Sequence, residues 1–102
     1  MVQLVEVLRA LNHNSGGANT EQSIYELKEI SINPSWVVHV RPDRAMKGNL
    51  NEGLLPRRLD KRSEFTRISL NSGQHGEEVT VVGDISVIRE KLNNGTRELL
   101  KG

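Results

Sequence analysis

The sequence predicts a small α+β domain in which an antiparallel β-meander of about four strands is followed by a C-terminal helix. Three observations support this class. Short segments rich in Val and Ile alternate apolar and polar residues, a glycine-rich turn joins two of them, and an amphipathic segment follows the last. The 102 residues suit one modest core, so we expect a single domain over 1–102 with an inserted loop at 44–63.

The first third of the chain contains two predicted strands and a connector. Residues 2–11, VQLVEVLRAL, are rich in β-branched valine and favour a strand, although their leucine spacing would also fit a helix. Residues 12–23 are rich in Gly, Asn and Ser and predict a mobile loop. In residues 24–32, Ile30 and Ile32 fall on one face and polar residues on the other, which is typical of a strand with one solvated face.

A corner and a further strand follow. Pro34 has a fixed φ and pushes Asn33 out of the α region, so this dipeptide predicts a sharp turn. Strand alternation after the turn then places Trp36, Val38 and Val40 on one face. Because aromatic residues are only 3% of the composition, we expect Trp36 to be the largest side chain of the core.

The last part of the chain predicts a hairpin and the C-terminal helix. Residues 64–70 and 78–83 are apolar β-like segments on either side of a glycine-rich turn, which indicates an antiparallel pair. Asp84 is a suitable N-cap for the amphipathic helix that follows. We expect this helix to end near Leu92, because residues 93–95 read Asn-Asn-Gly.

The inserted segment 44–63 combines many charges with several leucines and allows two interpretations. Its leucines could form a short amphipathic helix that docks in a partner's groove, although Pro56 would make such a helix start after it rather than cross it. Equally, they could fold back over the sheet, because a core this small needs every large apolar residue. The candidate partner-binding residues are Leu50, Leu54, Leu55 and Leu59.

The residue types needed for catalysis or metal binding form no recognisable pattern. The chain has no cysteine, which excludes disulfides, thiolate catalysis and Cys-based zinc or iron–sulfur sites. His13, His39 and His75 do not pair at i, i+3 or i, i+4 spacing, and no Gly-x-Ser-x-Gly elbow or phosphate-binding loop is present. We therefore expect no catalytic site, no metal and no cofactor.

Charge is nearly balanced, with 14 Lys and Arg against 13 Asp and Glu and a formal net charge of +1. A basic cluster lies in the region 41–67, but acidic residues interspersed in it offset about half of the positive charge. A surface that follows a phosphate backbone would carry less acid, so this dilution favours a protein partner over a nucleic acid. The candidate nucleic-acid contacts are Arg57, Arg58, Lys61 and Arg62.

Four stretches of the chain carry a resemblance to a known family. In order, they are LVEVLRALN, ISINPSWVVHVRPD, FTRISLNSG and VTVVGDISVIREKL. Together they cover about half of the chain and resemble the small swarming-motility/FlbD-like family of flagellar-operon proteins. The resemblance implies a β-rich fold that ends in a helix, and it carries over no catalytic residue because that family has no established catalytic site. Insertions at 13–23 and 44–63 depart from the family's pattern.

Two further resemblances concern parts of the chain. The turn, valine-rich strand and helix around VTVVGDIS also look like part of the LytTR-type DNA-binding fold. Gly83 and Asp84 stand where that family has Ser and Arg, which weakens the DNA-binding interpretation. Residues 41–65 are similar to uncharacterised accessory proteins of tailed cyanobacterial phages, and this similarity implies no mechanism.

These observations favour a non-enzymatic module that binds another protein or a second copy of itself, as a regulatory or phage accessory protein. The expected contacts are the segment 44–63 and the edge strand of the sheet. The alternative is a transcription-linked nucleic-acid-binding protein that uses the basic region. No apolar run approaches the roughly 20 residues of a transmembrane helix, and the N-terminus lacks a signal-peptide pattern, so we expect a cytoplasmic protein without membrane contact.

Overall fold

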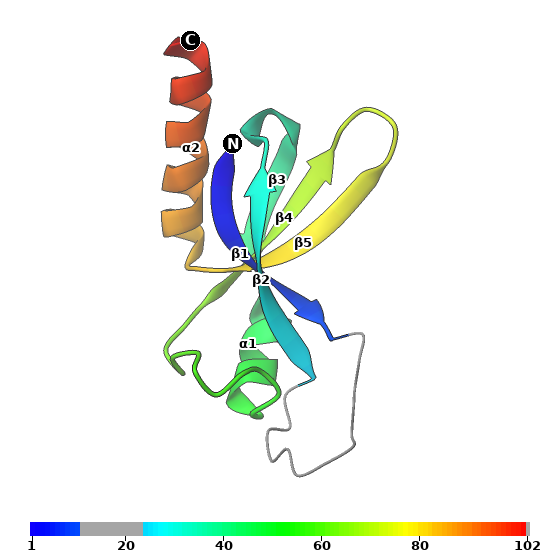
Figure 1. The fold of residues 1–102 in the computed structure, drawn as a ribbon, viewed down its shortest axis with the longest axis vertical. Helices are drawn as coiled ribbons and strands as arrows, with labels where there is room; N and C mark the ends of the chain where they lie inside the picture. Colours follow the sequence, from blue (N-terminus) through cyan, green and yellow to red (C-terminus); the bar gives the residue numbers. More distant parts are fainter. Residues whose placement is uncertain (11–23, 102) are drawn as a thin grey trace.

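The computed structural model describes residues 1–10 and 24–101, with side chains as far as Thr96. The predicted loop at 12–23, which includes His13, lies outside the described residues. The described residues form five strands and two α-helices, with a short 3-10 helix η1 between two of the strands, and Figure 1 shows how they are arranged. In chain order the elements are β1 (Val2–Arg9), β2 (Tyr25–Ile32), η1 (Pro34–Trp36), β3 (Val37–Pro42), α1 (Arg44–Asn51), β4 (Phe65–Asn71), β5 (Gly76–Val82) and α2 (Ile85–Lys101).

The strands form one antiparallel sheet in the order β2-β1-β5-β4-β3. The predicted α+β class is confirmed, and the sheet has five strands rather than about four because the ambiguous first segment is also a strand. Successive strands are neighbours except for β2 and β3, and β1 additionally pairs with β5 through Glu6 opposite Val81 and Val7 opposite Thr80. As a result, β2 and β3 are the two edges of the sheet, although only the short η1 segment joins them in sequence.

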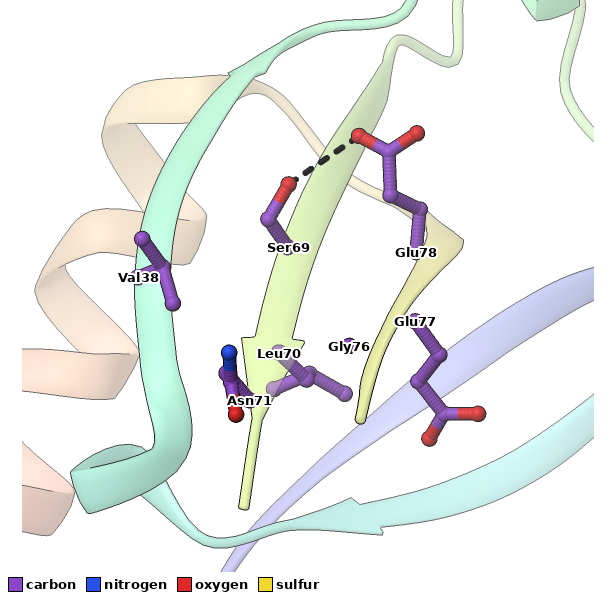
Figure 2. A pocket seen from close by; sticks show the side chains of 7 residues that line it. All are labelled: Val38, Ser69, Leu70, Asn71, Gly76, Glu77 and Glu78. Atoms are coloured by element: carbon purple, nitrogen blue, oxygen red, sulfur yellow. Dashed lines mark hydrogen bonds between the residues drawn. The ribbon is translucent and has the colours of Figure 1, made fainter. Parts of the chain in front are cut away.

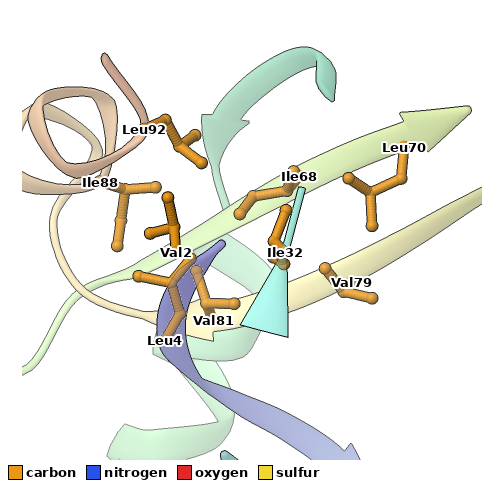
Figure 3. Close-up of a cluster of buried hydrophobic side chains, with 9 residues drawn as sticks. All are labelled: Val2, Leu4, Ile32, Ile68, Leu70, Val79, Val81, Ile88 and Leu92. Atoms are coloured by element: carbon orange, nitrogen blue, oxygen red, sulfur yellow. The ribbon is translucent and has the colours of Figure 1, made fainter. Parts of the chain in front are cut away.

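One face of the sheet packs against α2 (Figure 3). Alternation along β1 and β5 directs Val2, Leu4, Val79 and Val81 to this face, where they meet Ile88 and Leu92 of the helix. Ile32 fulfils the prediction made for the second strand, since it is buried in the same cluster. The buried members of this α2-side core are Val2, Leu4, Ile32, Ile68, Leu70, Val79, Val81, Ile88 and Leu92.

A second core holds the inserted segment against the sheet. Val7, Leu50, Leu55 and Phe65 are its buried residues. Residues 44–63 are therefore an ordered part of the domain rather than a loop free of structure, and their first half forms α1. Asp43 caps α1 by accepting a hydrogen bond from the Met46 backbone N–H at 3.0 Å.

The expectation that Trp36 fills the core is wrong, because its side chain is 48% exposed. The cause is local. Pro34 starts the 3-10 helix η1, and Asn33 caps it by accepting a hydrogen bond from the Ser35 backbone N–H at 2.9 Å. Trp36 is thus the last residue of a helical turn and does not follow the alternation of the strand behind it.

The face predicted for Val38 is also wrong, whereas Val40 lies on the core side as predicted. The pairing of β3 with β4 shifts register between Val37 and His39, which marks a β-bulge. Val37 before this bulge and Val40 after it pack against the α2-side core, whereas Val38 at the bulge is 62% exposed. A bulge adds one residue to a strand, so it reverses the side on which the following side chains fall.

The predicted cap of α2 is confirmed, but its predicted end is wrong. The Asp84 carboxylate accepts a hydrogen bond from the Ser86 backbone N–H at 3.0 Å, and the helix then runs to Lys101 instead of stopping near Leu92. Gly95 is buried inside the helix, where an added Cβ would overlap Val2 Cγ2 and lie 3.5 Å from Pro34 Cγ. Gly95 therefore allows close helix–sheet contact, and this packing outweighs its low helix propensity.

Candidate functional site

The four leucines proposed for partner binding line the second core. Leu50 and Leu55 are buried, with Leu55 only 3% exposed, and Leu54 and Leu59 pack half-buried against the same cluster. The backbone holds them in place as well, since the Leu54 carbonyl accepts hydrogen bonds from the Ile24 N–H at 2.9 Å and the Tyr25 N–H at 3.3 Å. The capping interpretation thus describes these leucines, and in this conformation Leu50 and Leu55 offer no surface to a partner.

The four candidate nucleic-acid contacts are all exposed on the irregular segment that follows Pro56. Arg62 forms an ion pair with Asp60, with 3.1 Å between Nη2 and Oδ2. Hydrogen bonds from the Arg62 side chain and backbone lower the pKa of Asp60, so its charge persists beside the cluster. The other three candidates are Arg57, Arg58 and Lys61. As the sequence predicted, an acidic residue lies among these basic ones and offsets part of their charge.

Asp43 is a buried charge that holds three elements together. It is 4% exposed; its Oδ2 accepts a hydrogen bond from Thr80 Oγ1 at 2.7 Å, and its Oδ1 lies 3.5 Å from Arg67 Nη2. Burial acts to raise the pKa of Asp43, but the hydrogen bonds from Thr80 and the Met46 N–H, together with Arg67, outweigh it and lower that pKa. With both oxygens engaged, this carboxylate joins α1 to β4 and β5 and is a structural group.

Two large apolar side chains are exposed at the start of the edge strand β3, that of Trp36 at the end of η1 and that of Val38. An open hollow of about 420 Å³ lies beside Val38 and is bounded on its other side by residues 69–71 and 76–78 of the β4–β5 hairpin (Figure 2). In this hollow Ser69 donates a hydrogen bond to the Glu78 carboxylate at 3.0 Å. A smaller hollow of about 50 Å³ brings Trp36 together with His75 and Glu77, so carboxylates and apolar surface lie side by side here.

A second hollow of about 240 Å³ lies between β3 and α2. Its apolar walls come from Pro34, Val37, Val40 and Leu92, and its polar groups are His39, Arg89, Asn93 and Thr96. The Thr96 hydroxyl donates to the Leu92 carbonyl at 3.1 Å. By contrast, the side chains of His39 and Arg89 form no hydrogen bond or ion pair with the part of the chain that the structure describes.

Sequence reasoning missed both hollows beside β3. The sequence placed Val38 in the core, and only the bulge exposes it. The hollow toward α2 has its wall only because this helix continues past residue 92, whereas the Asn-Asn-Gly stretch predicted that the helix ends there. A usable signal was Pro42 in β3, because proline cannot donate to a strand ladder and within sheets is confined to edge strands, first residues and bulges.

Among the side chains described, those of residues 1–10 and 24–96, no three from His, Asp or Glu lie close enough together to hold a metal ion. His39 lies on β3 and His75 on the β4–β5 hairpin. Among the same residues, no helix combines the length and apolar character needed to span a membrane. Comparison with protein-family models, curated proteins and solved structures finds no match to this chain.

Proposed function

We propose that this chain is a non-enzymatic protein-binding module that takes an extended segment of its partner along the edge strand β3. The observation that carries the proposal is the combination of a sheet edge, the exposed apolar side chains of Trp36 and Val38, and a hollow toward each neighbouring element. An edge strand has backbone N–H and C=O groups that no neighbouring strand pairs, so an added strand can bond to them. Both edge pairing and burial of Trp36 then supply affinity.

Side chains of an added strand would point alternately to the two sides of β3. One set would meet Val38 and the β4–β5 hairpin, and the other would meet α2. Burying the exposed half of Trp36, on the order of 100 Å², would contribute roughly 2.5 kcal/mol. That gain is offset by the ordering of a flexible segment, so we expect a moderate affinity of the kind typical of peptide-binding modules.

The two ends of β3 limit how far such pairing extends. The bulge at Val37 and His39 twists the strand, and Pro42 has no N–H to donate. These features disfavour a long, nonspecific sheet extension, because they interrupt the regular edge at each end. The proposed segment is therefore short and centred on the residues between them.

The test uses peptides selected from a random displayed library on the immobilised chain. A selected peptide is then titrated by fluorescence anisotropy and examined by hydrogen–deuterium exchange. The proposal expects slower exchange along 37–41 on binding, because unpaired edge amides become hydrogen-bonded. Val38→Lys should weaken binding by about tenfold, whereas Val87→Lys is the matched control, since Val87 is a 46% exposed valine on α2 that lines neither hollow.

The results of this test can contradict the proposal or identify a different partner for the edge. Protection that maps to other elements, or equal weakening by the two lysine variants, would remove β3 as the binding edge. If sedimentation velocity shows concentration-dependent dimers that Val38→Lys abolishes, the occupant of the edge is a second copy of this chain. Salt-sensitive binding to duplex or single-stranded DNA would instead support the alternative function, which rests on the exposed cations between Arg57 and Arg62.

A further inference from the structure

We infer that the hollow between β3 and α2 selects a carboxylate side chain on the bound segment. This inference rests on the proposed function and names the chemistry of the partner. The polar side chains that α2 contributes to this hollow are the guanidinium of Arg89 and the amide of Asn93, beside a Thr96 hydroxyl that already donates to the Leu92 carbonyl, and no carboxylate lines it. A site made of donors and a cation between apolar walls matches an acidic side chain with an aliphatic stem.

The cation in this hollow is available. Arg89 has no ion-pair partner among the described residues, and its side chain is exposed at the rim of the hollow. A guanidinium can bind a carboxylate through two parallel hydrogen bonds, and these are shorter and stronger than bonds between neutral groups. Arg89 and Asn93 lie one helical turn apart on α2, so a carboxylate in this hollow would be within reach of both side chains.

The size of the hollow fits one side chain. Its volume of about 240 Å³ is below the roughly 300 Å³ at which pockets for drug-sized ligands begin. Pro34, Val37, Val40 and Leu92 provide apolar contacts for the methylene groups of Glu. The hollow therefore has both a surface for the stem of an acidic residue and donors for its head.

The hollow on the other side of β3 has the opposite charge character. Glu77 and Glu78 line it, and Glu78 is already hydrogen-bonded by Ser69. An acidic side chain placed there would be repelled, while the same side chain placed toward α2 would be attracted. A slip of one residue moves every side chain of a strand to the other side, so this charge difference would also set the register of the bound segment.

The test uses a series of synthetic peptides of alternating Thr and Val that differ at one central position, which is Glu, Gln or Lys. The peptides are titrated against the whole chain by fluorescence anisotropy at low and high salt. We expect the Glu peptide to bind about tenfold more tightly than the Gln peptide, and high salt to reduce this preference. Arg89→Gln should abolish the preference, and Arg89→Glu should transfer it to the Lys peptide.

The matched control is Lys91→Gln, which removes an exposed cation of the same helix that does not line the hollow. It should leave the Glu preference unchanged, and thermal unfolding should show all three variants to be folded, because both positions are exposed. Equal binding of the Glu and Gln peptides, with β3 protected from exchange, would overturn the inference while leaving strand addition intact. If no peptide of the series protects β3, the inference fails together with the proposed function.

Discussion

Replacing Asp43 by alanine tests how the inserted segment is held to the sheet. The substitution removes three interactions at once: the N-cap bond to Met46, the bond from Thr80 and the charge pair with Arg67. The carboxylate is 4% exposed, so water cannot replace these partners without opening the contact between α1 and the sheet. We expect the variant to fold with clearly reduced stability, and α1 to be the first element to loosen.

The magnitude follows from the separate contacts. Loss of an N-cap costs about 1 kcal/mol, and loss of a hydrogen bond to a charged acceptor costs roughly 1.5–3 kcal/mol. Together they predict a fall of about 3 kcal/mol in the free energy of unfolding, which is a large part of the roughly 5–15 kcal/mol typical of a domain. For a domain of this size, such a loss lowers Tm by roughly 12–24 °C.

Urea unfolding at neutral pH measures this loss. Asp60→Ala is the control, because Asp60 is exposed and pairs only with Arg62 two residues away among the contacts described, so it should change stability by less than about 0.5 kcal/mol. A double-mutant cycle with Thr80→Val should show coupling of at least about 0.5 kcal/mol. A loss no larger than that of the control, or an absent coupling, would refute the role given to this carboxylate.

The same group predicts an acid dependence with a definite sign. Hydrogen bonds and Arg67 outweigh burial and lower the pKa of Asp43 below its ordinary value of 3.8. The unfolded chain therefore binds this proton more tightly, so the contribution to stability is present above that value and is lost as the pH falls through the folded-state pKa. Asp43→Asn should unfold with a flatter pH profile below about pH 4 than the unsubstituted chain, as followed by urea titrations at several acid pH values.

Three further changes have expected outcomes. Gly95→Ala should lower stability by about 1 kcal/mol in thermal unfolding, because overlap with Val2 outweighs the helix propensity of alanine; a stabilised variant would contradict this packing. Leu55→Ala should cost about 2–5 kcal/mol in urea unfolding, while an unchanged midpoint would return this leucine to the docking interpretation. Burial and Glu77 raise the pKa of Glu6, and the opposing effect of Lys28 is smaller. The stability that comes from protonating Glu6 is therefore lost as the pH rises through this pKa. Glu6→Gln should be more stable than the unsubstituted chain at pH 7 and should lose this advantage below about pH 4.5.

Local patterns of the chain were sufficient to predict most of its elements. Alternation of Ile30 and Ile32 with polar neighbours predicted β2, and the glycine-rich turn predicted the β4–β5 hairpin. Asp84 predicted the start of α2, because an N-cap is a property of a few adjacent residues. These features depend on contacts between near neighbours in sequence, which is why the sequence discloses them.

The candidate site could not be predicted in the same way. The bulge that exposes Val38 is set by the register of β3 on β4, a pairing between residues about thirty positions apart in the chain. The choice between docking and capping for Leu50 and Leu55 depended on whether the sheet offered them a surface, and Val7 and Phe65 provide it. No local period contains that information.

By itself, the sequence determined the α+β class, the positions of most strands and the near balance of charge. Only the tertiary structure decided that the inserted leucines belong to the core, that α2 continues past Gly95, and that β3 is an edge with a hollow toward α2 and another toward the β4–β5 hairpin. The physical reason is that secondary structure follows from local geometry and periodicity. Burial and exposure follow from which distant segments meet, and a single bulge or a single glycine contact is enough to change them.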